Sequence, residues 1–349
     1  MHPLPTMALL FSLALSTIMV SFSYNWMLTW MFLEVNTIVV IPLMARTQSP
    51  RAVEATTKYF ITQSIAAAMY LFASVANIML TGNWNIFEAS EPLPLTIAVL
   101  GLAIKLGLAP VHSWVPEVLQ GVDLSAGLIL STLQKLAPLA VFLTLPNINP
   151  TLLLSIGLLS VLVGGWGGLN QTQLRKVLAY SSIAHMGWFI SVLSLDRSVA
   201  MQVLVIYLLM TASMFLMFKL NSVNSINSLG TSWSKSPILA LISPLLLLSL
   251  AGLPPLSGFA PKMMVLEKLS QHGLAIYAIS IALSALLSLY FYLRLAYAMG
   301  LTTYPAPLSS LMVWRPSIKN PITTPLAISA TATIMLLPLL PATLTYLAQ

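Results

Sequence analysis

Four charged side chains lie deep within long apolar stretches of the chain: Glu34, Lys105, Lys135 and Lys262. A charge at the centre of a bilayer costs from about 3 to more than about 10 kcal/mol, so it persists only where it faces water or a partner. Desolvation favours the neutral form of a buried lysine, and a neighbouring carboxylate such as Glu34 favours the charged form. Side chains balanced in this way can be switched by a neighbour's charge. We therefore expect these four residues to form a proton path.

Two histidines accompany these charges. His185 lies in the middle of an apolar stretch, one turn after Ser181 and Ser182, and His112 follows Pro110 by two residues. A single histidine inside a helix is usually a packed, hydrogen-bonded residue. Because these two occur together with buried lysines, and because histidine exchanges its proton near neutral pH, we predict that both belong to the path.

Each charged side chain also has a purely structural interpretation. Glu34 could pair with a lysine only to hold helices together, although a buried ion pair is weak evidence for stability. Lys105 and Lys262 could extend along the helix surface toward the membrane boundary. Lys135 has the most central position and the poorest route to water. The functional interpretation of the set is therefore favoured.

Prolines interrupt two apolar stretches that are too long for one simple span. The pattern G-L-x-P ends at Pro110 and is followed by Pro116. The same pattern ends at Pro255 and is followed by Pro261. Proline removes a backbone donor and frees carbonyl groups that lipid cannot satisfy. We expect a broken, locally hydrated helix at each site, with the four prolines as its hinges.

Composition defines the elements that must position these residues. The chain has 349 residues, 58% hydrophobic and 7% charged, whereas soluble domains have about 25% charged residues. Most of its surface must therefore face lipid. Apolar stretches of about 20 residues, enough to span a bilayer as a helix, occur at eleven places. They are 4–23, 26–45, 57–80, 92–120, 125–145, 149–169, 174–194, 198–219, 236–271, 274–297 and 323–346.

An internal repeat relates the two broken stretches. The proline pattern and the first five predicted helices recur 145 residues later. Because five is an odd number, the second copy must enter the membrane from the opposite side, as in many transporters. We therefore predict an all-α integral membrane fold of eleven transmembrane helices in one polytopic domain. It comprises a first five-helix repeat at 1–145, an inverted second repeat at 146–298, and a loop with a C-terminal helix at 299–349; the fourth and ninth helices are broken.

Loop charges predict the orientation of the chain. Most lysines and arginines of the loops fall on the side of the N-terminus, whereas Glu88, Glu91 and Asp196 fall on the other side. Positively charged loops stay in the compartment where insertion starts. We expect the N-terminus on the inner side and, after an odd number of helices, the C-terminus on the outer side. The formal net charge of +7 is scattered, and no basic face forms that would indicate a nucleic-acid partner.

Several kinds of site are missing from the sequence. It contains no cysteine, which excludes disulfides, thiolate metal sites and cysteine-ligated iron–sulfur clusters. It contains no glycine-rich phosphate-binding motif and no H-E-x-x-H motif, and its four histidines have no paired spacing. We therefore expect no metal, cofactor or redox centre in this chain.

Long motifs surround the candidate residues. They are L-E-V-N at 33–36, T-K-Y-F-I-T-Q at 57–63, G-L-A-P-V-H-S-W-V-P-E-V at 107–118, L-Q-K-L-A-P-L at 133–139, Q-L-R-K-V-L-A-Y-S-S-I-A-H-M-G-W at 173–188 and G-L-P-P-L-S-G-F-A-P-K at 252–262. These motifs resemble chain 2 of mitochondrial NADH:ubiquinone oxidoreductase (respiratory complex I), a family of antiporter-like subunits of its membrane arm. The likeness covers nearly the whole chain.

The resemblance implies a function and a location. Family members carry protons through a buried Glu–Lys pair, a central lysine and a lysine of a second broken helix, driven by quinone reduction elsewhere in the complex. These roles fall on Glu34 with Lys105, on Lys135 and on Lys262. The resemblance implies a mitochondrial inner membrane protein with its N-terminus in the matrix and its C-terminus in the intermembrane space. The implied partners are other membrane-arm subunits and membrane lipids, while NADH, FMN, iron–sulfur clusters and ubiquinone belong to the complex rather than to this chain.

The chain departs from the family pattern near some of these residues. Leu133 and Met263 stand where tryptophan is usual, and Val111 and Ser113 flank His112 where phenylalanine is usual. The resemblance assigns His112 and His185 to the support of the water chain, and these departures predict that the lining differs locally, most of all around His112.

Two other functions compete with the proton-channel hypothesis. A free-standing cation/proton antiporter would use an inverted repeat and buried lysines equally well, but it needs a carboxylate in the second repeat, where Ala179 is the counterpart of Glu34. A non-conducting structural subunit is the third possibility. It leaves the mid-membrane lysines without a role.

Overall fold

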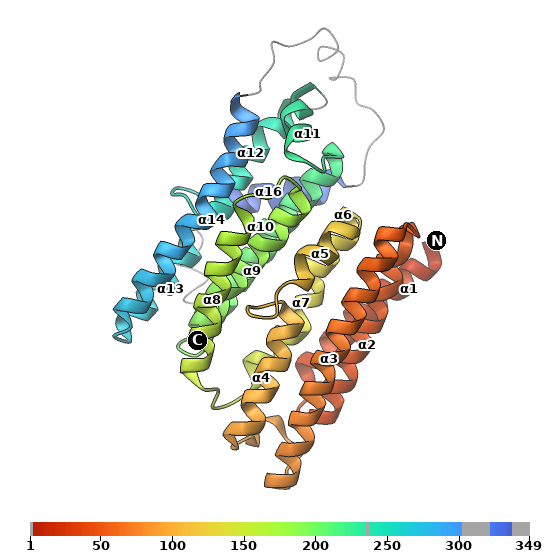
Figure 1. Cartoon of the computed structure of the whole chain (residues 1–349), viewed down its shortest axis with the longest axis vertical. Coiled ribbons are helices and arrows are strands. Elements are labelled where there is room, and N and C mark those ends of the chain that lie inside the picture. The colour runs from red at the N-terminus through yellow and green to blue at the C-terminus, as the bar shows by residue number, and fades with distance from the viewer. Residues whose placement is uncertain (1–2, 235–236, 302–321, 337–349) are drawn as a thin grey trace. The chain divides into compact units, whose positions relative to one another are not determined.

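The computed structural model describes residues 3–234, 237–301 and 322–336, and within these ranges it contains helices and no strand (Figure 1). The chain divides into two compact units, residues 1–157 and 158–349. Each unit is described by itself, and helix α8, Pro150–Gly168, runs from the first into the second.

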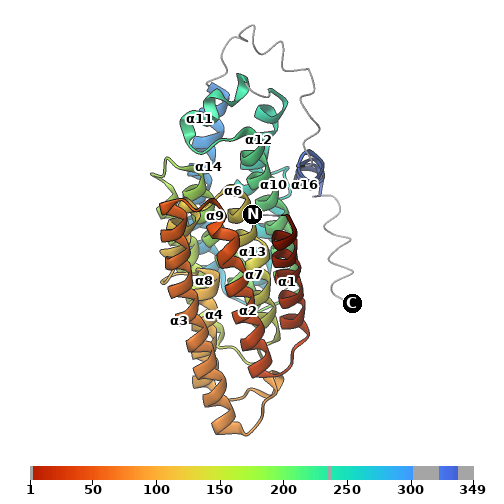
Figure 2. The same cartoon turned by 90° about the vertical axis from the view of Figure 1, so that its right-hand side faces the viewer.

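Unit 1 contains seven helices before α8. They are α1 (Pro3–Phe22), α2 (Trp26–Met44), α3 (Pro50–Thr81), α4 (Pro92–Leu106), α5 (Trp114–Gly121), α6 (Leu124–Ser131) and α7 (Leu133–Thr144), with short 3-10 turns η1 (Ala45–Thr47) and η2 (Ile86–Glu88). Helix α2 packs between α1 and α3, and α3 also contacts α4 and α5 (Figures 1 and 2). Helix α7 packs on α1, α2 and α4, so that it lies in the interior of the unit.

Local sequence explains where α3 begins and ends. The Ser49 hydroxyl accepts a hydrogen bond from the Ala52 amide at 3.2 Å, and Pro50 occupies the first turn, both of which are typical of a helix start. Gly82 ends the helix with a φ of +74°, a conformation that glycine adopts without steric cost. The helix therefore starts at Pro50, one to two turns before the predicted residue 57.

The break predicted in the fourth apolar stretch is confirmed. Helix α4 ends at Gly107, whose φ is +74°. The Gly107 amide bonds to the Ile104 carbonyl at 3.0 Å and the Leu108 amide to the Ala103 carbonyl at 2.9 Å, which is the Schellman pattern of a helix C-terminus. The chain resumes as α5 at Trp114, and the connection contains a cis Ala109–Pro110 bond.

A second interruption in unit 1 was not predicted. The apolar stretch 125–145 is divided at Thr132, which separates α6 from α7 and has φ −115° and ψ −77°. The Thr132 hydroxyl donates to the Leu128 carbonyl at 2.6 Å, a bond that competes with regular helix geometry and bends helices. Threonine, unlike proline, does not predict a helix break from the sequence.

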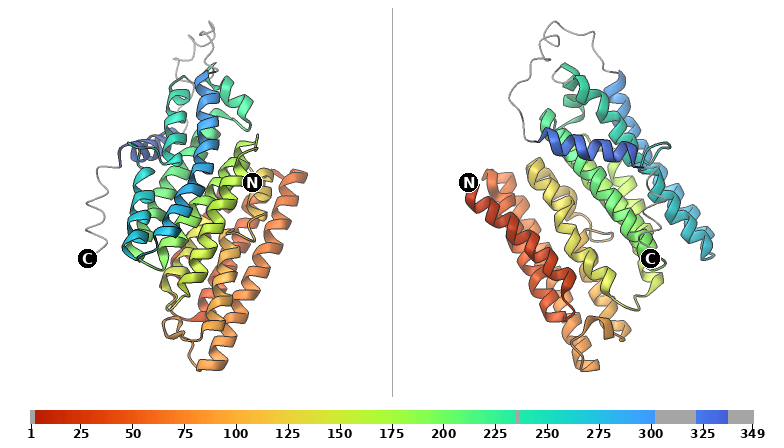
Figure 3. Two further views of the ribbon diagram at one scale, coloured as in Figure 1. Left: turned by 60° about the vertical axis from the view of Figure 1, so that its left-hand side comes forward. Right: turned by 180° about the vertical axis from the view of Figure 1, so that it is seen from behind.

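The described residues of unit 2 contain the following helices after α8. They are α9 (Leu174–Leu193), α10 (Arg197–Asn221), α11 (Ile226–Gly230), η3 (Thr231–Ser234), α12 (Pro237–Ala251), α13 (Phe259–Gln271), α14 (Ala275–Leu301) and α16 (Thr323–Met335). Helix α10 contacts α9, α12, α13 and α16, and α14 contacts both α12 and α13. Helix α16 runs across α10 rather than along it (Figure 3).

The ninth apolar stretch is broken like the fourth. Gly252 has a φ of +77°, its amide bonds to the Ser249 carbonyl at 3.0 Å, and the Leu253 amide bonds to the Leu248 carbonyl at 3.2 Å. Helix α12 thus ends in the same Schellman pattern as α4. A cis Pro254–Pro255 bond lies in the connection to α13.

Among the described residues, seven helical segments are individually long and apolar enough to cross a membrane. They are Leu4–Phe22, Trp26–Thr47, Pro50–Thr81, Leu124–Thr144, Pro150–Gly168, Arg197–Asn221 and Ala275–Gly300. Helix α4 and the stretch Ile238–Ala251 are apolar but shorter, as expected for halves of broken helices. Most of the predicted loop 299–322 and the second half of the last predicted helix lie outside the described residues.

Candidate functional site

The two buried lysines of unit 1 lie at its two helix interruptions. Lys105 belongs to the last turn of α4 and is 4% exposed, and Lys135 belongs to the first turn of α7 and is 5% exposed. The Lys135 amide bonds to the Thr132 carbonyl at 3.2 Å, so the α6–α7 interruption sets the position of this residue. Each buried amine is therefore placed where regular helical hydrogen bonding stops.

Glu34 lies close to Lys105 without a direct ion pair. It is a half-buried residue in the middle of α2, and its Oε2 accepts a hydrogen bond from the Thr37 hydroxyl at 3.1 Å. The charge of Glu34 interacts electrostatically with both Lys105 and the Tyr59 hydroxyl. Glu34 forms none of the ion pairs within the described ranges. The Lys105 Nζ is buried and has no hydrogen-bond partner among the described residues.

His112 lies in the α4–α5 break and contacts the break itself. Its Nδ1 is 3.0 Å from the Pro110 carbonyl oxygen, and its side chain is half-buried. Pro116 is buried in the first turn of α5. The Trp114 indole donates to the Ile104 carbonyl at 3.1 Å, so an aromatic side chain rather than the histidine caps the end of α4.

Lys262 reaches back across the break of unit 2. It lies in the first turn of α13, just after Pro261, and its Nζ donates to the Ala251 carbonyl, the last of α12, at 2.5 Å. A Cβ added to Gly252 would lie 2.9 Å from the Cδ, Cε and Nζ of Lys262. The glycine therefore leaves room for the lysine, and the amine satisfies a carbonyl at a helix C-terminus, where cations are favoured. Pro255 lies in the same connection and is exposed.

His185 has aromatic and hydroxyl neighbours in unit 2. It is a buried residue of α9, and its ring centroid is 5.8 Å from that of Tyr207 on α10. Ser182, one turn before His185, hydrogen bonds to the Tyr207 hydroxyl. Ser182 and His185 of α9 are therefore both neighbours of Tyr207 on α10.

A charged cavity lies at the N-terminal end of α3. Lys58 Nζ is 2.8 Å from carboxylate oxygens of both Glu54 and Glu117. These side chains, together with Arg51 and Gln120, line a cavity of about 210 Å³ between α3 and α5. We call it the α3–α5 cavity. Glu117 is 51% exposed, so it belongs to this polar end of unit 1 and not to the buried set.

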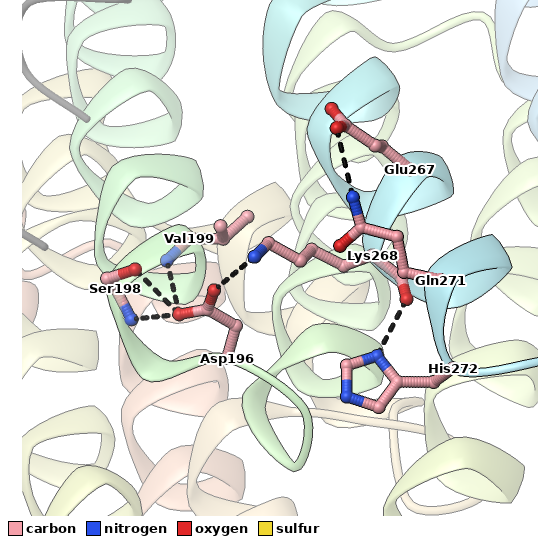
Figure 4. Close-up of polar contacts among 7 residues, drawn as sticks. All are labelled: Asp196, Ser198, Val199, Glu267, Lys268, Gln271 and His272. Carbon is pink, nitrogen blue, oxygen red and sulfur yellow. Dashed lines mark hydrogen bonds and ion pairs between the residues drawn. The ribbon is translucent and has the colours of Figure 1, made fainter. Parts of the chain in front are cut away.

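An ion pair connects two elements at one end of unit 2 (Figure 4). Asp196, before α10, accepts hydrogen bonds from the amide and hydroxyl of Ser198 and from the Val199 amide, and its Oδ2 is 2.9 Å from Lys268 of α13. Partial burial alone would raise the pKa of Asp196, but the hydrogen bonds from Ser198, Lys268 and the backbone outweigh it and lower the pKa to about 2. This carboxylate caps α10 and connects it to α13.

One buried contact of unit 1 was missed by the sequence reasoning. The Gln134 amide donates to the Tyr59 hydroxyl at 2.7 Å, and both side chains are buried. The available signal was the position of Gln134 immediately before Lys135. Within the described part of the chain, no group of three or more histidine, aspartate or glutamate residues is arranged to hold a metal. The chemistry that the arrangement can support is the transfer and storage of protons.

Comparison with known proteins identifies the family. The family described as "NADH:quinone oxidoreductase/Mrp antiporter, TM" matches residues 23–288, and "NADH dehydrogenase subunit 2 C-terminus" matches residues 289–344. NADH-ubiquinone oxidoreductase chain 2 of Tetraodon nigroviridis is 56% identical, with 99% of each chain covered. The chain of the same name from Xenopus laevis is 50% identical, with 99% of this chain and 100% of that one covered.

Solved structures agree with this result. A chain of respiratory complex I from Thermus thermophilus with bound aureothin is 26% identical with a TM-score of 0.84, covering 97% of this chain and 78% of that one. A chain of the Mrp complex from Dietzia sp. shares the fold, with a TM-score of 0.81 at 17% identity over 97% of this chain and 76% of that one. From the family match over most of its length and from relatives that are 50–56% identical across nearly all of it, the chain belongs to the NADH-ubiquinone oxidoreductase chain 2 family.

Proposed function

We propose that the chain is a proton-translocating, multi-pass inner-membrane subunit of respiratory NADH:ubiquinone oxidoreductase. The observation that carries this proposal is the placement of Lys105, Lys135 and Lys262 at three helix interruptions in a protein of the antiporter-like family. An interruption leaves backbone groups that need polar partners, so it draws water and charge into an otherwise apolar interior.

In this proposal the buried residues have defined roles. Glu34 adjusts the proton affinity of Lys105, Lys135 is the central carrier, and Lys262 carries the proton at the second break. A carboxylate close to an amine but not bonded to it can stabilise the charged form while leaving the amine free to release its proton. His112 and His185 support the path, and the prolines 110, 116, 255 and 261 keep the two breaks open.

The wider arrangement follows from the same proposal. Eleven transmembrane helices form two inverted five-helix repeats and a last helix, with the N-terminus in the matrix and the C-terminus in the intermembrane space. The subunit works beside other membrane-arm subunits and lipids. NADH, FMN, iron–sulfur clusters and ubiquinone act elsewhere in the complex, and their redox energy reaches this chain through its neighbours.

Removal of the central amine tests the proposal. In sealed vesicles that hold the assembled complex, we expect Lys135→Met to preserve assembly and to lower NADH-driven proton uptake by about tenfold or more, the order that positioned proton-transfer groups contribute. Lys219→Met removes an exposed lysine at the end of α10 and serves as the control. A structural subunit would keep full proton uptake in both variants.

Native separation distinguishes the antiporter alternative. We expect the chain to migrate with NADH:quinone reductase activity in one large assembly after mild solubilisation. A chain that migrates apart from this activity, and whose proton movement depends on an added cation instead of NADH, would be a free-standing antiporter.

A further inference from the structure

A hydroxyl group connects the buried charges of unit 1 to a second helix. Tyr59 of α3 is fully buried, its hydroxyl accepts the 2.7 Å hydrogen bond of Gln134, and Glu34 is within its electrostatic range. Gln134 precedes Lys135 on α7. The phenol is thus in contact with the residue next to the central lysine and close to the carboxylate of α2.

The same tyrosine lies where α3 changes from charged to apolar. Lys58 is the last charged residue of this helix, and residues 59–81 contain none. Ala55 lines the α3–α5 cavity and lies one turn before Tyr59 on the same helix face. Tyr59 therefore lies between a cavity lined with titratable groups and the buried charges.

One further polar side chain continues this face of α3 into the unit. Gln63, one turn after Tyr59, has a buried amide nitrogen without a hydrogen-bond partner among the described residues. Buried polar groups in proteins are as a rule satisfied by protein or ordered water. A buried amide of this kind is typical of a hydrated site rather than of a packed apolar core.

The hydrogen-bond arrangement suits proton relay. An amide N–H does not give up its proton under ordinary conditions, so Gln134 positions the Tyr59 oxygen and leaves the phenolic hydrogen to point elsewhere. When the oxygen accepts a proton on its remaining lone pair, the original O–H bond breaks and that hydrogen passes to the next acceptor. One proton crosses, the phenol is restored, and nothing is oxidised or reduced.

We propose that the Tyr59 hydroxyl is a proton-relay group of unit 1, located between the α3–α5 cavity and Glu34, and that Gln134 is its positioning residue. This inference rests on the proposed function above. The competing explanation is that the bond only joins α3 to α7, as the Tyr70–Thr29 hydroxyl contact at 3.0 Å joins α3 to α2.

That second contact supplies a matched control. Tyr59→Phe and Tyr70→Phe each remove one hydroxyl, and one hydrogen bond, from a fully buried tyrosine of the same helix. The ring contact of Tyr59 with Trp114, at 5.9 Å between centroids, survives in phenylalanine. In the assembled complex we expect Tyr59→Phe to lower NADH-driven proton uptake about tenfold or more, and Tyr70→Phe to leave it within about twofold of the parent.

The outcomes separate this inference from the function on which it rests. Loss of proton uptake in Lys135→Met and Tyr59→Phe but not in Tyr70→Phe supports the relay. Loss in Lys135→Met alone, or equal effects of the two tyrosine variants, overturns the relay and leaves the function intact. Full uptake in Lys135→Met overturns the function itself.

A second variant covers a failure of Tyr59→Phe to assemble. Gln134→Leu keeps the phenol and removes only the group that positions it. We expect proton uptake to fall several-fold and its ratio between H2O and D2O to rise above that of the parent, because transfer through a misaligned hydroxyl becomes rate-limiting. Unchanged uptake with an unchanged isotope ratio would contradict the proposal.

Discussion

At the scale of single residues, Lys105 and Lys262 have different electrostatic environments. Lys262 bonds to a helix-terminal carbonyl, whereas Lys105 has only the neighbouring charge of Glu34. A hydrogen-bonded amine is held in place, and one stabilised through space can change its charge without breaking a bond. In the proposed path, Lys262 is therefore the amine that is held in place, and Lys105 is the amine whose charge responds to its neighbour.

The Asp196 carboxylate leads to a prediction about pH. Asp196→Asn keeps a good helix cap but loses the charge that pairs with Lys268. We expect a loss of about 1 kcal/mol in local stability, because the pair is partly exposed. Amides 198 and 199 should then exchange with solvent roughly fivefold faster in the variant, measured by hydrogen exchange of the solubilised complex.

The sign of the pH dependence follows from the lowered pKa. A carboxylate whose pKa falls to about 2 on folding stabilises the folded state above its unfolded pKa of about 4, and the effect is lost as the pH falls toward 2. The difference between parent and variant should therefore be constant from pH 8 to pH 5. Glu267→Gln, one position before Lys268 on α13, is the control and should not change these amides. A difference that varies between pH 5 and pH 8 would count against the ion pair as its cause.

Residue types in the sequence predicted part of this site. A charge in an apolar stretch is costly, and for that reason Glu34, Lys105, Lys135 and Lys262 could be selected without a structure. Tyr59 could not, because tyrosine is an ordinary residue of apolar helices and its bond to Gln134 joins positions 75 residues apart. The assignment of Glu34, the three lysines and both histidines to a proton path stays a prediction.

At the scale of elements, prolines and glycines predicted both breaks. The pattern G-L-x-P marks a helix end followed by a residue that cannot continue the helix, so the ends at Gly107 and Gly252 followed from sequence. The division of 125–145 at Thr132 did not, because its cause is a single side-chain bond to the Leu128 carbonyl.

The glycine of the second break yields a test with a close control. Gly252→Ala places an L-residue at φ +77°, which costs about 1–2 kcal/mol, and its Cβ would displace the Lys262 side chain. Gly273→Ala, at the end of α13, has φ +75° and nothing within 4 Å of the added Cβ. Both variants should lower thermal stability, but only Gly252→Ala should reduce NADH-driven proton uptake. Equal uptake in the two would mean that the bond between Lys262 and Ala251 has no role in translocation.

At the scale of the whole molecule, the proposed sidedness can be measured directly because the chain contains no cysteine. Single cysteines at the exposed positions Thr47 and Asn224 should react with an impermeant thiol reagent only from the matrix side. Cysteines at the exposed positions Asn83 and His272 should react only from the intermembrane side. Thr47 and Asn83 flank α3, and Asn224 and His272 lie in two loops of unit 2, so each unit is tested by itself. Reaction of both Thr47 and Asn83 from one side, or of both Asn224 and His272 from one side, would contradict the predicted topology.

The repeat itself remains a prediction from sequence. The offset of 145 residues carries Gly107 onto Gly252 and Pro110 onto Pro255, and the helix ends at these two glycines have the same hydrogen-bond pattern. The charged residues do not obey the offset, since Ala179 is the counterpart of Glu34 and Leu250 that of Lys105. The glycines and prolines that end the helices recur in the two halves, whereas the titratable groups differ. The repeat can therefore be recognised only from the glycines and prolines.

The length of α3 has a consequence for the surrounding lipid. Its 32 residues extend about 48 Å, while a hydrocarbon core is about 30 Å thick, so the segment that ends at Lys58 belongs among the headgroups. If the bilayer thinned, α3 could not sink without drawing Lys58 and both of its carboxylates into hydrocarbon, and it would tilt instead. The charged end of α3 therefore fixes the depth of this helix in the bilayer. Hydrophobic thickness then sets the tilt of α3, while the Tyr59 hydroxyl, next to the anchored Lys58, keeps its distance from the headgroups.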